Sequence, residues 1–343
     1  MTKTRAIIHL GPIKTGTTAL SRYFTLTNQK GLTPTHIVFP SGDLWFGEDG
    51  EIVRQRRRLE ALMEPRVHHL GNAANAAKPG SELDQGVAKV AAALREAKVP
   101  VATAIFVVET GLPRFNPAIL DNFLKRHFDE VTYLFMARRQ DKLVTSILAQ
   151  NMKMWEHRWV TLNPRIELAK RPALRDFAAL NYAKQWRRWA DVVGAENLLV
   201  VPYLEGEQGS FGTIDRIFEF AGLGKAPRVE GIEGKRIHPT FSVQGMNRLA
   251  HIKSIGRWAW FFPPFRKRLT EVWQTSIAAY HGGAIEGIKD PDGTPFVPWS
   301  LSDSDRRFVM RKFLGANRAL RALQNNHPSL WDSWLKETVE AAK

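Results

Sequence analysis

Short runs of apolar, often β-branched residues recur between residues 5 and 203, and each is followed by a segment of helical periodicity. Such runs predict strands that are buried on both faces, as in a parallel sheet covered by helices. The predicted strands are residues 5–11, 36–40, 102–109, 131–138 and 197–203. The helical segments lie near 17–29, 82–98, 116–127, 140–155 and 173–193. This alternation predicts βαβ crossovers and a doubly wound α/β fold.

The rest of the chain has a different pattern. Residues 41–80 form a long insertion between the second and third strands, and residues 240–343 lack strong strand signals. We therefore expect one α/β domain over residues 1–255, with a helical insertion at 41–80. A helical C-terminal extension over 256–343 is expected to pack on the same domain.

Cysteine is absent from all 343 residues. This excludes a disulfide framework, cysteine-ligated zinc and a thiol nucleophile, and it suits a reducing compartment. The longest apolar run, at 99–108, is half the length of a membrane span. The first residues contain no secretory signal pattern. We expect a cytoplasmic protein without a transmembrane segment.

The net charge of +15 comes from 49 basic against 34 acidic residues and favours an anionic partner. Nucleic acid, an acidic glycan, a nucleotide or a membrane surface would each fit. We find no recognition helix, RNA-binding motif or basic-aromatic stripe that supports nucleic acid. The aromatic elbow WAWFFPPF at 258–265 is compatible with peripheral membrane contact, although a packed elbow or a dimer contact fits it better.

A glycine-rich stretch, HLGPIKTGTTAL, follows the first predicted strand at residues 9–20. Gly11 and Gly16 have the spacing of a nucleotide-binding P-loop, but Thr17 stands where that motif has lysine. The single lysine, Lys14, lies inside the loop. Glycines and a helix N-terminus can direct N–H groups at an anion. A lysine within the loop can neutralise charge on a bridging oxygen as a group leaves a nucleotide phosphate.

A second anion-binding pattern follows the fourth strand. Arg138 ends that strand, and Ser146 lies eight residues later in the next helix, so both can converge on one phosphate. Arg139 is an adjacent alternative whose spacing to Ser146 is one residue short. The carboxyl ends of parallel strands share one sheet edge, where ligands bind. This places residues 11–18, Glu109 and Arg138 at the same edge.

Together these two patterns resemble the sulfotransferases that use 3′-phosphoadenosine-5′-phosphosulfate (PAPS). GPIKTGTTAL looks like the 5′-phosphosulfate loop of that family, and Arg138 with Ser146 looks like its 3′-phosphate element. The resemblance implies a P-loop-like fold and sulfuryl transfer to a hydroxyl or amine of a small-molecule or carbohydrate acceptor, without a metal. It implies a phosphosulfate site formed by Gly11, Lys14, Thr15, Gly16, Thr17 and Thr18.

Weaker similarity to bacterial members extends over most of residues 1–255, including 181–204 and 236–252. The family's late RKGxxGxW segment is missing, which leaves Gly234, Lys235 and Arg236 as candidates to cover the adenosine.

The sequence leaves the identity of the general base open. Small-molecule members of the family carry a histidine in a K-T-H-L-P segment, whereas residues 109–113 here are E-T-G-L-P. Glu109 is the first candidate and His69, or its neighbour His68, is the second. His9 in the first strand is expected to be buried. An ATP-dependent small-molecule kinase with a variant P-loop, a nucleic-acid-binding protein and a PAPS-binding pseudoenzyme remain alternatives.

Overall fold

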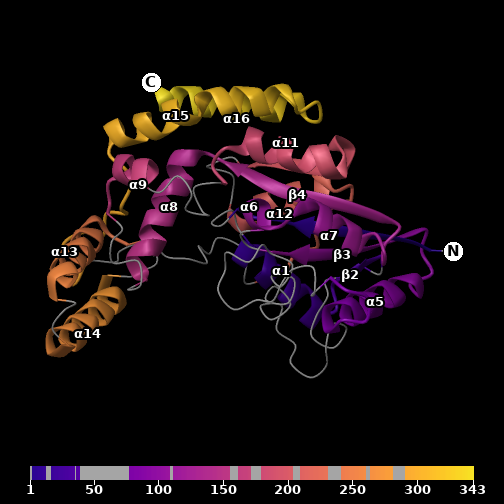
Figure 1. Cartoon of the computed structure of the whole chain (residues 1–343), viewed down its shortest axis with the longest axis horizontal. Helices are drawn as coiled ribbons and strands as arrows, with labels where there is room; N and C mark the ends of the chain where they lie inside the picture. Colours follow the sequence, from indigo (N-terminus) through magenta and orange to yellow (C-terminus); the bar gives the residue numbers. More distant parts are fainter. Residues whose placement is uncertain are drawn as a thin grey trace. The chain divides into compact units, whose positions relative to one another are not determined.

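The computed structural model describes residues 2–12, 17–34, 36–38, 77–108, 111–154, 161–170, 179–203, 209–230, 241–259, 263–280 and 290–343. The backbone forms two compact units (Figure 1). Unit 1 consists of Met1–Arg138, Ala178–Lys235 and Ala316–Trp334, and unit 2 consists of Arg139–Phe177, Arg236–Gly315 and Leu335–Lys343. The domain boundary at residue 255 stays a prediction.

Unit 1 contains a five-stranded sheet in the order β2-β3-β1-β4-β5, in which every neighbouring pair is parallel. The strands are β1 (Lys3–His9), β2 (Ile37–Val38), β3 (Val101–Val107), β4 (Glu130–Arg138) and β5 (Leu198–Tyr203). Each falls within or close to an apolar run of the sequence, which confirms an α/β fold with a parallel sheet and flanking helices.

The strand order creates a topological switch point beside β1. The chain passes from β1 to β2 and β3 on one side, and then crosses β1 to reach β4 and β5 on the other. The connections that leave the carboxyl ends of β1 and β4 therefore diverge, although the two strands are neighbours. Crevices of this kind are where open α/β sheets bind ligands.

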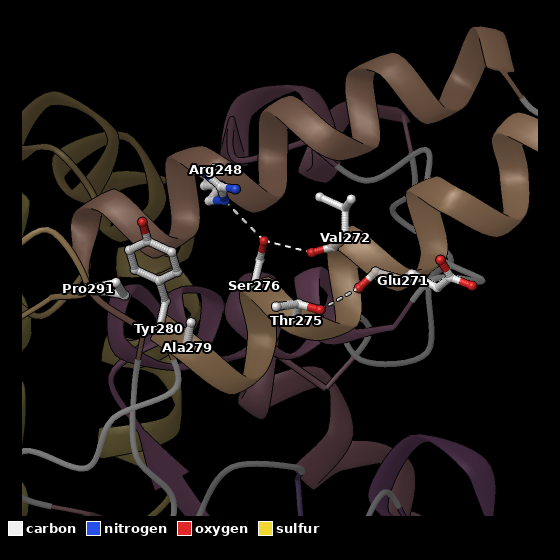
Figure 2. A pocket seen from close by; sticks show the side chains of 8 residues that line it. All are labelled: Arg248, Glu271, Val272, Thr275, Ser276, Ala279, Tyr280 and Pro291. Atoms are coloured by element: carbon white, nitrogen blue, oxygen red, sulfur yellow. Dashed lines mark hydrogen bonds between the residues drawn. The ribbon is translucent and has the colours of Figure 1, made fainter.

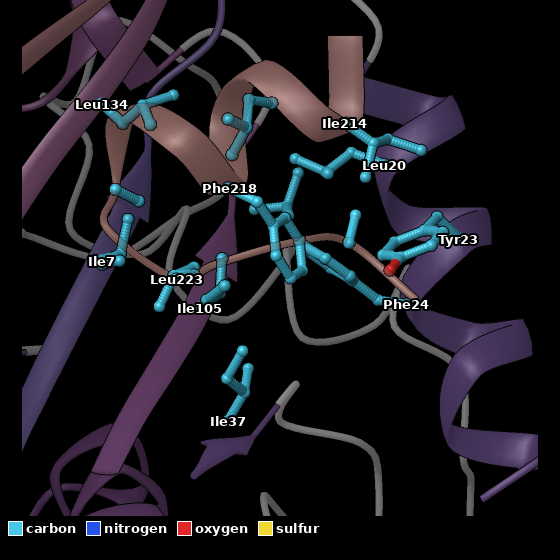
Figure 3. Close-up of a cluster of buried hydrophobic side chains, with 14 of the residues drawn as sticks. Ile7, Leu20, Tyr23, Phe24, Ile37, Ile105, Leu134, Ile214, Phe218 and Leu223 are labelled. Atoms are coloured by element: carbon cyan, nitrogen blue, oxygen red, sulfur yellow. The ribbon is translucent and has the colours of Figure 1, made fainter. Parts of the chain in front are cut away.

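One face of the sheet is covered by α1 (Thr17–Gln29) and α12 (Gly209–Phe220). Figure 3 shows aromatic and aliphatic side chains of both helices meeting strand residues such as Ile7, Ile105 and Leu134. The Tyr23 and Phe218 rings meet edge to face at 6.0 Å. This apolar layer fixes the position of the helix that follows the glycine-rich loop.

Helices α5 (Glu82–Arg95), α7 (Pro117–Leu124) and α11 (Tyr182–Val193) form the second layer of unit 1. Tyr133 and Phe135 alternate with the first-face residues along β4 and contact Trp189 and Tyr182, with ring centroids 5.1 and 6.2 Å apart. Trp189 is fully buried. Helices on both faces make the sheet doubly wound.

Local capping and backbone geometry decide where several predicted elements begin and end. The Asn181 side chain accepts a hydrogen bond from the Lys184 amide at 3.0 Å, so α11 begins at Tyr182 within the predicted 173–193 segment. Helix α8 (Gln140–Lys153) ends before Met154, whose backbone is extended. The predicted strand at 36–40 is described as only Ile37 and Val38.

The described part of unit 2 is mostly helical. It contains α8, α9 (Pro164–Lys170), α13 (Val243–Ala259) and α14 (Pro263–Tyr280), while α15 (Asp303–Ala322) and α16 (Pro328–Ala342) are divided between the units. The buried Lys253 donates hydrogen bonds to the carbonyl oxygens of Asn151 and Met154 at 2.6 and 2.8 Å, which anchors α13 to the end of α8. These helices confirm the helical character predicted after residue 240. No helix within the described ranges combines the length and apolarity that crossing a bilayer requires.

Candidate functional site

The end of β1 lies between two neighbouring strands. The Leu10 amide donates to the Leu134 carbonyl of β4 at 2.8 Å, and the Val108 amide donates to the His9 carbonyl at the same distance. Gly11 follows with a φ of +86°, in the region that favours glycine because it has no Cβ. The chain thus turns out of the sheet at the first glycine of the predicted loop.

The loop itself is only partly described. Lys14, Thr15 and Gly16 lie outside the described residues, whereas Thr17 begins α1. The helix therefore starts where the sequence predicted it, and its first N–H groups follow the loop directly. Nothing is described for the Thr17 and Thr18 side chains.

The segment that carries Glu109 is held against β1 at both ends. Glu109 and Thr110 lie outside the described residues, but their neighbours do not. Besides the bond from Val108, the Leu112 amide donates to the Leu10 carbonyl at 2.7 Å. The backbone on either side of Glu109 is thus bonded to the last residues before the loop.

Helix α11 fixes the same segment from the other side. Arg188 donates to the carbonyl oxygens of Leu112 and Phe115, and Trp189 Nε1 donates to that of Leu112 at 2.9 Å. Leu112 belongs to the short helix α6 (Gly111–Arg114), which begins two residues after Glu109, and Phe115 directly follows that helix. Sequence reasoning missed this anchoring role of Trp189, which depends on a contact across more than seventy positions.

Arg138 is held at the end of β4 by two tyrosines. Its carbonyl accepts a hydrogen bond from the fully buried Tyr182 hydroxyl at 2.7 Å, and its guanidinium lies 5.0 Å from the centre of the Tyr203 ring. Burial raises the pKa of the Tyr182 phenol above its usual value, and the bond to Arg138 opposes that shift only in part. The phenol therefore stays a donor at neutral pH. Tyr203 ends β5, so the arginine is oriented by the neighbouring strand.

The adjacent Arg139 is engaged in a different interaction. Its Nε and Nη2 atoms donate to the two carboxylate oxygens of Asp141 at 3.1 and 2.7 Å. This bidentate pair satisfies the guanidinium fork that a phosphate would otherwise use. Arg139 is thus engaged within its own segment, and the assignment of Arg138 as the anion ligand stays a prediction.

Ser146 lies on α8 and is half-buried. Its hydroxyl donates to the Lys142 carbonyl of the preceding turn at 3.0 Å. Hydroxyls bonded in this way can turn toward a stronger acceptor at little cost, because the carbonyl keeps its helical partner. Ser146 belongs to unit 2 and Arg138 to unit 1, so their convergence on one phosphate stays a prediction.

The remaining candidate residues are not placed by the described part of the chain. His68, His69, Gly234, Lys235 and Arg236 lie outside the described residues. Within the described part of the chain, no three acidic, histidine or cysteine side chains are grouped in a way that could hold a metal ion.

A separate hollow lies in unit 2 between α13 and α14, with a volume of about 380 Å³ (Figure 2). Arg248 Nε donates to the Ser276 hydroxyl at 3.0 Å on one wall, and Tyr280 and Pro291 lie at one end. The Ser276 hydroxyl in turn donates to the Val272 carbonyl. The hydrogen bonds described for its lining side chains are made within these two helices, and the sequence patterns for anion binding lie elsewhere. We therefore treat the edge beside β1 and β4 as the candidate site.

Comparison with solved structures shows a distant similarity to a sulfotransferase structure. No family model matches the chain, and no curated protein matches it. The crystal structure of a sulfotransferase from Alicyclobacillus acidocaldarius is similar at 16% identity with a TM-score of 0.42, over 95% of this chain and 98% of that one. A similarity this distant carries no functional argument, so the proposal below rests on residues of this chain.

Proposed function

We propose that this chain is a sulfotransferase that moves a sulfuryl group from PAPS to a hydroxyl or amine. The observation that carries the proposal is the sheet order. The glycine-rich loop leaves β1, Arg138 ends β4, and these strands are neighbours with diverging connections. Two anion-binding patterns that are more than a hundred residues apart in sequence thus leave the same edge at the switch point.

The loop supplies the site for the 5′-phosphosulfate. Gly11 turns the chain out of the sheet, and the N-terminus of α1, which begins at Thr17, offers N–H donors to the anion. The hydroxyls of Thr17 and Thr18 add donors. Lys14 neutralises the charge that develops on the leaving phosphate oxygen, a task that magnesium performs in phosphoryl transfer.

Arg138 and Ser146 bind the 3′-phosphate that distinguishes PAPS from ATP. Tyr182 fixes the main chain of Arg138, and the Tyr203 ring contacts its guanidinium before the nucleotide arrives, so less side-chain freedom is lost on binding. The arginine then contributes a charge-assisted interaction, which is stronger than a neutral hydrogen bond.

In the transfer, the acceptor oxygen or nitrogen forms a bond to sulfur while the bond from sulfur to the 5′-phosphate oxygen breaks. The acceptor's proton must go to a base in line with the leaving group. Glu109 is our first candidate, because the residues on both sides of it are bonded to the end of β1. His69 and His68 are the alternatives. The acceptor class is a small molecule or a carbohydrate, and we propose a cytoplasmic location.

The first experiment is calorimetric titration with adenosine 3′,5′-bisphosphate, the product of PAPS, and separately with ATP, both in EDTA. The bisphosphate should bind, and Lys14→Ala and Arg138→Ala should each weaken it at least tenfold. Lys3→Ala is the control for Lys14, because Lys3 begins β1, the strand that precedes the loop, and pairs with Glu130. Arg228→Ala is the control for Arg138, because it removes an arginine that pairs with Asp215 in the same unit.

The kinase alternative gives a different result. Magnesium-dependent binding of ATP, with no binding of the bisphosphate, would refute the sulfotransferase proposal. Binding of the bisphosphate without turnover of PAPS on a panel of alcohols, amines and sugars would favour a pseudoenzyme. Ser146→Ala should weaken the bisphosphate while Thr145→Ala, which removes the neighbouring back-bonded hydroxyl, should not.

A further inference from the structure

His9 is an unusual residue for the centre of a parallel sheet. It ends β1, the middle strand, and is only 1% exposed. Neither ring nitrogen has a hydrogen-bond partner on another described residue. A neutral imidazole carries one donor and one acceptor, and the backbone of His9 itself can engage only the donor, so the acceptor nitrogen is left unsatisfied.

The surroundings of His9 are apolar. Side chains two apart on a strand share a face, so His9 lies on the same face as Ile7. Its register partners are Val107 on β3 and Leu134 on β4, and both belong to the apolar cluster beneath α1 and α12. Burial lowers the pKa of the imidazole to about 4, so it is neutral at physiological pH.

An apolar side chain would fill this position without leaving polar groups unsatisfied. Buried polar groups almost always have partners, and exceptions concentrate at functional positions. His9 lies two residues before Gly11 and on the face that α1 covers, and α1 starts at the end of the loop. Its burial keeps it from touching an acceptor, so a role as the base does not fit.

We infer that His9 is a positioning residue for the donor loop, whose imidazole gains in the nucleotide-bound state a hydrogen-bond partner that the described residues of the ligand-free chain do not supply. The inference rests on the proposed function, since it requires a nucleotide phosphate in that loop. The unsatisfied imidazole lowers the stability of the free protein, and its new hydrogen bond raises the affinity for the nucleotide. Stability and affinity should therefore respond to substitution with opposite signs, which a merely structural histidine would not produce.

The test uses the full chain with His9→Leu and His9→Asn, adenosine 3′,5′-bisphosphate as the probe, and urea unfolding without ligand. His9→Leu should leave the ligand-free protein as stable as wild type or more stable, and should weaken the bisphosphate at least tenfold. His9→Asn keeps a donor and an acceptor, so its affinity should return to within about threefold of wild type. Ile7→Val is the control, because it trims the same strand face and should lower stability without changing affinity.

Each outcome decides the matter. If His9→Leu binds the bisphosphate as wild type does, the inference is wrong while the proposed function stands. If His9→Leu unfolds or loses stability, the imidazole already has a partner in the free protein, and the inference is also wrong. If wild type itself does not bind the bisphosphate, the proposed function fails first and the inference fails with it.

Discussion

Removing one hydroxyl should reveal how Arg138 is held. Tyr182→Phe deletes the hydroxyl of a buried side chain, which donates to the Arg138 carbonyl at 2.7 Å, and keeps the ring that stacks on Phe135. A typical hydrogen bond contributes about 1 kcal/mol, and an acceptor left without a partner raises the loss to about 1–3 kcal/mol. We expect the free energy of unfolding to fall by that amount. Bisphosphate affinity should fall about threefold to tenfold, because Arg138 loses its main-chain anchor.

The assay is urea unfolding combined with calorimetric titration of adenosine 3′,5′-bisphosphate. Tyr133→Phe is the matched control. It removes a buried phenol hydroxyl from the same layer of unit 1, where it donates to Asp121 at 3.1 Å. Tyr133 precedes Arg138 by five residues on β4, so this variant should lose similar stability and keep wild-type affinity.

The titration of the phenol adds an independent measurement. The pKa of Tyr182 is raised in the folded state, so its contribution to stability is present below about pH 10 and is lost as pH rises further. Tyr182→Phe should flatten that alkaline decline. Equal affinity losses in the two variants, or no loss in Tyr182→Phe, would contradict the view that Tyr182 positions Arg138.

Three further predictions concern the same edge. Gly11→Ala places a Cβ at a φ of +86°, which should lower stability by about 1–2 kcal/mol and weaken binding of the bisphosphate at least tenfold. The control Gly222→Ala, at a φ of +65° in open space, should lower stability by a similar amount and leave the affinity unchanged. Arg188→Met removes the donors to the Leu112 and Phe115 carbonyls and should destabilise the chain by about 2–3 kcal/mol. In a turnover assay it should lower kcat more than bisphosphate affinity, because it loosens the segment of the proposed base; an affinity loss as large as the kcat loss would contradict this. The folded-state pKa of His9, about 4, lies below its ordinary 6.5, so up to about 3 kcal/mol of stability should disappear as pH falls through that window, and His9→Leu should show a flatter acid profile in urea unfolding.

The sequence alone determined the features that depend on neighbouring residues. Apolar runs in helical surroundings predicted the parallel strands, because a strand covered on both faces must be apolar on both. Glycine spacing located the turn after β1 and the start of α1, which the backbone at Gly11 and Thr17 confirms. Element ends were less accurate: α11 starts well inside its predicted range because the Asn181 cap, and not the apolar pattern, sets its first residue.

Only the tertiary structure decided which strands are neighbours and what holds the site. Strand order depends on pairing between distant segments, and period-two patterning carries no information about partners. The anchoring of Arg138 by Tyr182 spans 44 positions, and the engagement of Arg139 by Asp141 could not be read from spacing. His9 was predicted to be buried, but its lack of a partner on another described residue depends on β3 and β4 bringing Val107 and Leu134 beside it. Neighbouring residues determine where helices and strands form, whereas the pairing of distant strands determines which side chains meet at the site. A side chain's partners are fixed only when the sheet is assembled.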